Sequence, residues 1–300
     1  MGITVIGAVF VDIKGYSINK YIPDGRNAGY IKEVHGGVAR NAAEDLANIG
    51  VDSRLVSLVD GSGTAVQVVR HLKESGVDTS LIKEADTGMG TWMAIFDEKG
   101  DVAANISVRP ELLPLIDHIE ENKKDIFEDT DAILLEIDVD EGIDEVVFGY
   151  AKQYGKKIYS FVSLMADAIK RKEYIKQSEC FICNLQEAGM LFKEEMKDRD
   201  IDSLIELISK KRREERIKNL IVTLGDKGSI YSGADGQSGY IKAAKVELKD
   251  STGAGDAFAA GAAAALTYDK TMQEACEIGT KMAADVITGT KNVCGKLECF

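Results

Sequence analysis

The chain has 300 residues, of which 45% are hydrophobic and 29% charged, with only 3 prolines. Such a chain can bury a sizeable core, so its composition excludes a disordered protein and allows one large α/β domain or two smaller ones. The net charge of −13 argues against nucleic acid and against an anionic membrane as partners, because both require a basic surface.

The chain opens on a strand-like apolar run, 3–6, rather than on a basic segment followed by an apolar one, so we expect no secretory signal. The longest run of small and apolar residues, 257–266, is about half the length that a membrane span requires. We therefore expect a cytoplasmic protein.

Short apolar runs alternate with helical patterns along most of the chain. We predict buried strands at residues 3–9, 55–59, 132–135, 157–161, 180–183 and 220–224. We predict helices at residues 38–49, 65–74, 141–154 and 201–213. This alternation is typical of a mostly parallel sheet that is covered by helices on both faces.

Two segments interrupt the alternation. Residues 14–34 are glycine-rich and strand-like in places, and residues 91–106 have the pattern of a hairpin with its turn at 97–101. The hairpin either extends the main sheet or belongs to a separate excursion. No internal repeat or low-complexity linker is visible, so we treat both segments as excursions from one domain.

The five cysteines include one C-x-x-C pair, Cys180 and Cys183, inside an apolar run. A zinc site would need a second spaced pair, and a redox motif would need a suitable helix start. We interpret the cysteines as reduced and mostly buried thiols.

Polar residues near the amino terminus suit a ligand with neighbouring hydroxyl groups. Asp12 follows the first strand, and Gly36-Gly37 precedes a helix that carries Asn41 on its first turns. Ligands of open α/β sheets bind at the carboxyl ends of strands, and the two glycines permit close approach. Each residue alone could be an ordinary turn or surface residue. Glu136, at the end of a strand, is a weaker candidate for the same ligand.

Asn184 and Glu187 follow a buried strand at N-x-x-E spacing. On the first turn of a helix, this spacing places two oxygen-bearing side chains on one face, which suits hydrated Mg²⁺. The same spacing is also a good capping pattern, and the spacing by itself favours the cap.

The element Thr223-Leu224-Gly225-Asp226-Lys227-Gly228 follows another strand, and Gly225 and Gly228 permit a tight turn beside phosphate or ribose. No G-x-x-x-x-G-K-[ST] element occurs, which argues against a P-loop NTPase. No G-x-G-x-x-G follows the first strand, which argues against a dinucleotide-dependent reductase.

The stretch from Asp250 to Phe258, D-S-T-G-A-G-D-A-F, is the most informative part of the sequence. Its small residues lead into a helix, whose free N–H groups and dipole attract an anion. Asp256, beside that anion, could accept a proton from a nucleophile. Alternatively, Asp256 caps the helix, although a cap does not explain Gly253 and Gly255. An anion cradle with a base is the minimum apparatus for transferring a phosphoryl group to a hydroxyl.

In this order, the motifs resemble the signatures of the ribokinase family of carbohydrate kinases, also called the PfkB family. The resemblance covers essentially the whole chain. It implies an α/β ribokinase-like three-layer sandwich with a mostly parallel central sheet, as a single domain over residues 1–300. It also implies a small β-sheet lid over the acceptor, formed by residues of about 14–35 and 88–107.

The resemblance implies transfer of the γ-phosphate of ATP to a hydroxyl group. Asp256 would be the general base, and the N–H groups of Gly253, Ala254, Gly255 and Asp256 would stabilise the phosphoryl group. Asp12, Gly36, Gly37 and Asn41 would hold the acceptor, with Glu136 as the weaker candidate. The ATP site would comprise Asn184, Thr223, Gly225, Gly228, Gly253 and Gly255. Asn184 and Glu187 would position Mg²⁺ through water, and carbonyl groups of Asp250 and Thr252 could hold K⁺.

The acceptor stays open at this point. Residues 11–15 and 37–47 look like the pseudouridine kinase branch, but residues 23–29 depart from that branch in a segment of the lid. The chain is thus a kinase of a sugar, a kinase of a nucleoside, whose base could stack on Trp92, Phe96 or Tyr30, or a non-catalytic sugar sensor. Apolar lid hairpins can also pair between subunits, so a homodimer through the lid is expected.

Overall fold

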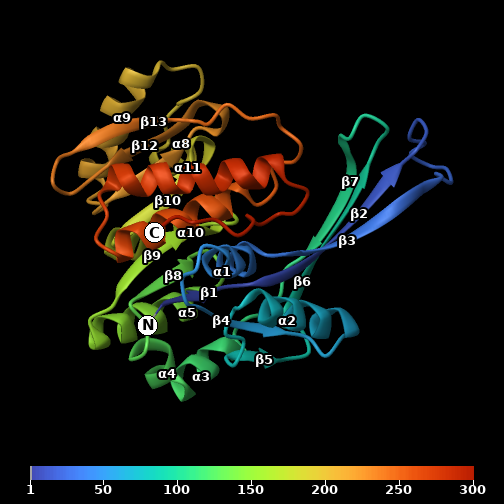
Figure 1. The fold of residues 1–300 in the computed structure, drawn as a ribbon, viewed down its shortest axis with the longest axis horizontal. Coiled ribbons are helices and arrows are strands. Elements are labelled where there is room, and N and C mark those ends of the chain that lie inside the picture. The colour runs from blue at the N-terminus through green and yellow to red at the C-terminus, as the bar shows by residue number, and fades with distance from the viewer. Residues whose placement is uncertain (1) are drawn as a thin grey trace.

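The computed structural model describes residues 2–300, which form two separate β-sheets (Figure 1). The large sheet has nine strands in the order β13-β12-β11-β10-β9-β8-β1-β4-β5. All neighbours from β5 to β11 are parallel, whereas β12 and β13 pair antiparallel at the other edge. The strands of this sheet are β1 (Ile3–Ile6), β4 (Ser53–Val59), β5 (Ile82–Glu84), β8 (Ala132–Glu136), β9 (Lys157–Phe161), β10 (Cys180–Asn184), β11 (Leu220–Thr223), β12 (Gly228–Ser232) and β13 (Ser238–Lys242).

Helices cover both faces of the large sheet. Along β8, Ala132 and Leu134 pack into one hydrophobic cluster, and Ile133 and Leu135 pack into the other, because successive side chains point to opposite faces. The first cluster is covered by α1 (Val38–Asn48), α2 (Gly63–Ser75), α10 (Ala254–Thr267) and α11 (Met272–Thr288). The second is covered by α3 (Pro114–Glu121), α4 (Lys123–Phe127), α5 (Glu141–Tyr154), α6 (Met165–Ala168), α7 (Lys172–Gln177), α8 (Leu185–Phe192) and α9 (Ile201–Glu214). The predicted three-layer α/β fold is confirmed.

The second sheet has four strands in the order β3-β2-β6-β7 and extends away from the body (Figure 1). Its strands are β2 (Val9–Ser17), β3 (Gly29–Gly36), β6 (Met89–Phe96) and β7 (Val102–Val108). The predicted hairpin is present as β6 and β7, and it builds this small sheet instead of extending the large one. The strands lie in the two excursions expected from the sequence, although β2 begins earlier, at Val9.

One predicted strand is wrong in its extent, because residues 3–9 do not form a single strand. The chain leaves the large sheet at Gly7 and Ala8 and begins β2 at Val9. A Cβ atom on Gly7 would lie 2.5 Å from Oε2 of Glu136, and the same Oε2 accepts a hydrogen bond from the Ala8 N–H at 2.8 Å. The buried carboxyl group therefore holds the chain where it passes from one sheet to the other.

None of the helices within residues 2–300 is both long enough and apolar enough to span a membrane. Cys180 and Cys183 are buried in β10, as the apolar run predicts, and burial raises the pKa of both thiols.

Candidate active site

The candidate site lies at the carboxyl ends of three neighbouring strands of the large sheet. A cavity of about 180 Å³ there is bounded by the ends of β9, β10 and β11 and by the first turns of α8 and α10. The carboxyl edge of an open parallel sheet is where such folds bind ligands. Residues that line this cavity include Phe161, Cys183, Asn184, Glu187, Thr223, Gly255 and Asp256.

The start of α10 requires glycine at position 253. Gly253 has a φ angle of 84°, and a Cβ atom there would lie 1.9 Å from the carbonyl oxygen of Asn292. Gly255 is different, since a Cβ atom at that position would meet nothing within 4 Å. Close packing therefore explains Gly253, whereas Gly255 leaves open space beside the backbone in the cavity.

Free N–H groups remain at the start of α10. The Ala254 N–H donates to the Ser251 carbonyl at 3.2 Å, so this expected donor is partly engaged in the turn. Within residues 2–300, the N–H groups of Gly253, Gly255 and Asp256 have no hydrogen-bond acceptor. These groups, together with the helix dipole, are suited to an anion.

The side chain of Asp256 makes a tertiary contact rather than a helix cap. The N-cap residue of α10 is Gly253, and Asp256 accepts a hydrogen bond from Nδ2 of Asn41 at 2.8 Å. Burial raises the pKa of Asp256 to about 7, and the Asn41 hydrogen bond and Arg40 oppose that rise. A carboxyl group with a pKa near neutrality can exchange a proton readily, as a general base must.

Of the two glycines before α1, Gly36 packs against the Asp12 side chain and Gly37 packs against the backbone of residues 8–10. A Cβ atom on Gly36 would lie 2.9 Å from Oδ1 of Asp12, and one on Gly37, whose φ angle is 97°, would lie 2.6 Å from the Ala8 carbonyl oxygen. Burial raises the pKa of Asp12, and the charge of Asp12 in turn raises the pKa of Asp256. The structure thus brings Asp12, Gly36 and Gly37 to the same region as Asp256.

Glu136 lies beneath this region and is only 1% exposed. Its carboxyl group holds the junction between β1 and β2, and burial raises its pKa to about 8. This position disfavours the direct contact with an acceptor that the sequence suggested. Glu136 instead acts on the path of the chain that carries Asp12.

Asn184 and Glu187 form a capping box at the start of α8. Oδ1 of Asn184 accepts a hydrogen bond from the Glu187 N–H at 2.9 Å, and Oε2 of Glu187 accepts one from the Asn184 N–H at 2.7 Å. Oε1 of Glu187 has no hydrogen-bond partner within residues 2–300. The pair therefore combines the cap with one free carboxylate oxygen in the cavity of Asp256, a donor set that fits a hydrated Mg²⁺.

A larger cavity, of about 980 Å³, lies on the other side of Asn184 and Thr223. The tight turn between β11 and β12 borders it. Gly228 has a φ angle of 116°, and a Cβ atom there would lie 2.0 Å from the Ile241 carbonyl oxygen. The cavity also receives apolar side chains from the 242–248 segment and from α10 and α11, among them Val246, Leu248, Phe258, Ala283 and Ile287. Its size and its mixture of apolar and polar lining suit a nucleotide.

The segment before α10 forms a small turn in which the Thr252 N–H donates to Oδ1 of Asp250 at 2.9 Å. Both residues are exposed. A monovalent cation on their carbonyl groups stays a prediction.

Sequence reasoning missed the side chains of Arg40 and Asn292 and the carbonyl group of His35, which surround Asn41. Nη1 of Arg40 donates to Oδ1 of Asn41 at 2.6 Å, and Nδ2 of Asn292 donates to the same oxygen at 3.0 Å. Both also donate to the His35 carbonyl oxygen. Arg40 lies inside a motif that the sequence did single out, whereas nothing local marks Asn292.

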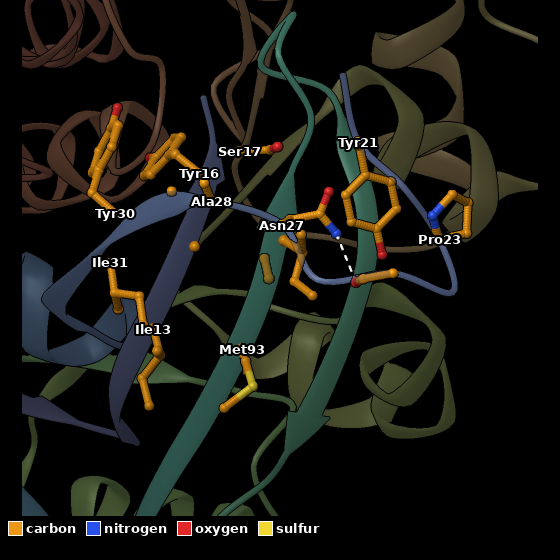
Figure 2. A pocket seen from close by; sticks show the side chains of 15 residues that line it. Ile13, Tyr16, Ser17, Tyr21, Pro23, Asn27, Ala28, Tyr30, Ile31 and Met93 are labelled. Carbon is orange, nitrogen blue, oxygen red and sulfur yellow. Dashed lines mark hydrogen bonds between the residues drawn. The ribbon is translucent and has the colours of Figure 1, made fainter. Parts of the chain in front are cut away.

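The small sheet has a cavity of its own, of about 510 Å³ (Figure 2). Tyr16, Tyr30, Ile31 and Met93 line it, together with the loop that departs from the pseudouridine kinase pattern. Figure 2 shows Asn27 inside that loop, where its Nδ2 donates to the Gly25 carbonyl at 3.2 Å. The hydrogen bonds of the Asn27 side chain thus stay within the loop, which joins β2 to β3 at one end of the small sheet.

The fold and the cavities at the carboxyl edge of its large sheet are those of a ligand-binding α/β protein. Residues 2–293 match the pfkB family carbohydrate kinase, and the chain belongs to this family.

Two relatives illustrate the range of the family around this chain. The guanosine-inosine kinase of Exiguobacterium acetylicum is 30% identical over 292 residues, which are 97% of this chain and 95% of the relative. The pseudouridine kinase of Escherichia coli (strain K12) is 25% identical over 272 residues, which are 87% of this chain and 82% of the relative.

Solved structures share the fold over almost the full length. The ribokinase of Arabidopsis thaliana complexed with ribose and ATP has a TM-score of 0.85 at 17% identity, covering 99% of this chain and 97% of the other. The ribokinase of Thermotoga maritima has a TM-score of 0.78 at 22% identity, covering 99% and 97%. At these identities the likeness concerns the fold.

Proposed function

We propose that the chain is an ATP-dependent kinase that transfers the γ-phosphate to an alcohol group of a sugar or of a sugar-containing small molecule. The observation that carries this proposal is the hydrogen bond between Asp256 and Asn41 at the start of α10. It holds a carboxylate next to free N–H groups in the 180 Å³ cavity, which shares Asn184, Thr223 and Gly255 with the 980 Å³ cavity. Family membership supports the same reaction class.

In the proposed reaction, Asp256 takes the proton of the acceptor hydroxyl as the hydroxyl oxygen attacks the γ-phosphorus of ATP. The bond between that phosphorus and the oxygen that bridges it to the β-phosphate breaks, and ADP leaves with the bridging oxygen. The N–H groups of Gly253, Gly255 and Asp256, with that of Ala254 beside them, then stabilise the charge on the transferring group, so that catalysis consists mainly of positioning and electrostatics. ATP would occupy the cavity beside Thr223, Gly225 and Gly228.

Glu187 and Asn184 would hold hydrated Mg²⁺ through water. Bound there, Mg²⁺ would neutralise phosphate charge. The proposal also retains K⁺ beside Asp250 and Thr252. A monovalent cation there would add positive charge next to the anion cradle. Comparing the rates of phosphoryl transfer in K⁺ and in Na⁺ would measure its effect.

A nucleoside acceptor is the second candidate, and two observations favour it. One is the 30% identity to a guanosine-inosine kinase over nearly the whole chain. The other is a set of aromatic side chains on the Asp12 face of the small sheet. Trp92 is the cross-strand neighbour of Asp12, and Tyr16 stacks on Tyr30 and on Phe96 at centroid distances of 5.0 and 4.8 Å. Aromatic faces of this kind stack on nucleobases.

The sensor alternative is weaker. A protein that only binds a sugar does not need a carboxyl group of raised pKa beside an anion site. In this chain Asp256 has both a pKa that burial raises to about 7 and a hydrogen bond from Asn41.

The small sheet serves as the lid in this proposal, within one domain over residues 1–300. Its other face carries exposed apolar side chains, among them Ile31, Met93 and Ile106, which could pair with a second copy. Light scattering would show a dimer that Ile106→Lys dissociates. A monomer at all concentrations would remove the homodimer from the proposal.

The function is tested by ADP release with ATP and Mg²⁺ on a panel of acceptors: ribose, fructose, inosine, guanosine, adenosine and pseudouridine. Asp256→Asn is measured in parallel, with the exposed Asp129→Asn as the matched control. We expect turnover on one acceptor class and a loss of about 10²- to 10⁴-fold in Asp256→Asn alone. Full activity in Asp256→Asn would remove Asp256 as the base. Binding of acceptors without any turnover would favour the sensor.

A further inference from the structure

The amide of Asn41 is held from both ends. Its Nδ2 donates to Asp256 at 2.8 Å. Its Oδ1 accepts from Nη1 of Arg40 at 2.6 Å and from Nδ2 of Asn292 at 3.0 Å. An amide side chain presents either its NH₂ group or its oxygen to a neighbour, and its surroundings decide which. Here two donors lie at one end and a carboxylate acceptor lies at the other.

Rotation of the Asn41 amide by half a turn would be unfavourable at both ends. Its NH₂ group would then face two donors, and its oxygen would face the carboxylate of Asp256. Arg40 and Asn292 therefore determine that Asn41 offers an N–H group to Asp256. Arg40 and Asn292 also donate hydrogen bonds to the His35 carbonyl oxygen at the end of β3, at 3.0 and 2.7 Å.

Asn292 is held in place by the segment that follows α11. The side chain is 9% exposed. Two residues further on, the Cys294 N–H donates to Oδ1 of Asp45 at 2.7 Å, and Nδ2 of Asn48 donates to the Cys294 carbonyl oxygen at 2.8 Å. The backbone of residue 292 lies so close to Gly253 that no other side chain fits there. The segment thus joins α1 to the first turn of α10.

We propose that Asn292 is a positioning residue for the phosphoryl transfer, acting through the orientation of the Asn41 amide on the carboxylate of Asp256. This inference rests on the proposed function, in which Asp256 is the base. Asn292 does not touch Asp256 itself, and it belongs to none of the motifs that the sequence singled out.

The charges around Asp256 predict the direction of the effect. Arg40 faces it from α1, and Asp12 from β2 and Glu187 from α8 add negative charge. The Asn41 N–H group opposes the negative neighbours by stabilising the ionised carboxylate. When the amide is free to turn, the carboxylate loses this donor for part of the time. The proton then leaves Asp256 at higher pH, and the oxygen that accepts the substrate proton is less well placed.

The experiment compares Asn292→Leu with Asn48→Leu. Asn292→Leu removes the hydrogen bonds from Nδ2 of Asn292 to Oδ1 of Asn41 and to the His35 carbonyl oxygen. Asn48→Leu removes the hydrogen bond from α1 to the Cys294 carbonyl oxygen and leaves Asn41 untouched. With the acceptor identified from the panel, kcat and the KM for ATP are measured from pH 5 to 9. For Asn292→Leu we expect kcat at pH 7 to fall about three- to tenfold, the loss typical of one hydrogen bond. We also expect the acid limb of the kcat profile to move upward by about half a pH unit, with the KM for ATP unchanged.

Three outcomes would overturn the inference: an unchanged profile in Asn292→Leu, an equal change in Asn48→Leu, or a loss confined to the KM for ATP. Should Asn292→Leu fail to fold in a thermal melt, Asn292→Ser replaces it, because the shorter hydroxyl leaves Oδ1 of Asn41 with Arg40 alone, and the same outcomes apply. Asp256→Asn separates the two proposals. If Asp256→Asn is inactive and Asn292→Leu is normal, only this inference fails, whereas an active Asp256→Asn removes the proposed function as well.

Discussion

The two sheets of this protein are stabilised in different ways. All five residues of β8 in the large sheet are buried, and two hydrophobic clusters sandwich the sheet. All seven residues of β7 in the small sheet are exposed, and five residues of β3 are exposed as well. The small sheet is held by its backbone ladder and by stacked rings such as Tyr16 and Tyr30.

This difference separates two tasks. The groups proposed for chemistry, Asp256 and Asn41, stand on α10 and α1, which pack against the first hydrophobic cluster, so their geometry has the rigidity of a core. The residues proposed to recognise the acceptor, such as Trp92, stand on a sheet whose outer strands, β3 and β7, are mostly exposed. A sheet of that kind can move at low cost in free energy. Four predictions test this division.

The first prediction concerns the core and has the largest expected effect on stability. Leu134→Ala removes a side chain that is 0% exposed, and we expect the free energy of unfolding to fall by about 2–5 kcal/mol. Ile106→Ala removes one that is 68% exposed, and we expect a change within about 0.5 kcal/mol. Urea denaturation of both variants measures the contrast. Similar losses would mean that the small sheet is covered in solution.

The second prediction concerns the close contact between residue 292 and the start of α10, next to Asp256. Gly253→Ala places a methyl group against the Asn292 carbonyl oxygen at a positive φ angle, so we expect a loss of about 2 kcal/mol or more in stability. Gly255→Ala enters open space at a helical position, and we expect no loss or a gain of about 0.5–1 kcal/mol. Thermal melts without ligand isolate stability from binding. Equal stability of the two variants would contradict the close approach of residue 292 to α10.

The third prediction concerns Asp144, a buried aspartate in α5. Both carboxylate oxygens of Asp144 lack a hydrogen-bond partner within residues 2–300, and burial raises its pKa to about 8, although Arg171 opposes the shift. An aspartate in the unfolded chain has a pKa of about 3.9. Between these values the folded state keeps a proton that the unfolded state has lost, so stability falls as pH rises and is lowest above pH 8.

We therefore expect Asp144→Asn to flatten the decline of the melting temperature between pH 5 and pH 8 and to add about 1–2 kcal/mol at pH 8. The exposed Asp129→Asn should leave the decline unchanged. A parallel decline in wild type and in Asp144→Asn would show that Asp144 ionises normally in the fold.

The fourth prediction concerns the small sheet and has the smallest effect on the fold. Trp92→Ala should leave the melting temperature nearly unchanged and should raise the KM for a nucleoside by about fivefold or more, since base stacking contributes about 1–3 kcal/mol. The KM for ribose, which has no base, is the internal control. A uniform loss with both acceptors would assign Trp92 to the sheet instead of to a nucleobase.

The same contrast explains how far the sequence could predict the fold. The helix at 141–154 and the strand at 157–161 were predicted with their observed bounds, because their apolar periodicity reports a core directly. The division of residues 3–9 between two sheets was missed, since the run is apolar throughout. The cause lies at Glu136, which is 128 residues away from Ala8 along the chain.

Only the local motifs of the site could be predicted from the sequence. The capping geometry of Asn184 and Glu187 follows from short-range spacing, whereas the requirement for glycine at 253 comes partly from the distant Asn292 carbonyl oxygen. The contact between Asn41 and Asp256, and the donor supplied by Asn292, join segments that no spacing rule relates. Glu136 was a weaker candidate for the acceptor, because a strand end gives no sign of how deeply its side chain is buried.

The large sequence separation of the residues around Asp256 has a consequence for the order in which the protein folds. Asn41 and Asp256 are 215 residues apart, and Asn41 and Asn292 are 251 apart, so the site closes over almost the longest loops that the chain can make. Closing such loops costs entropy that local helices and hairpins do not face. During synthesis, α1 is made early and lacks its contacts with α10 and with residue 292 until those residues have been made. Every strand of the large sheet is therefore synthesised before α10, and Asp256, the proposed base, meets Asn41 only late in the life of the nascent chain.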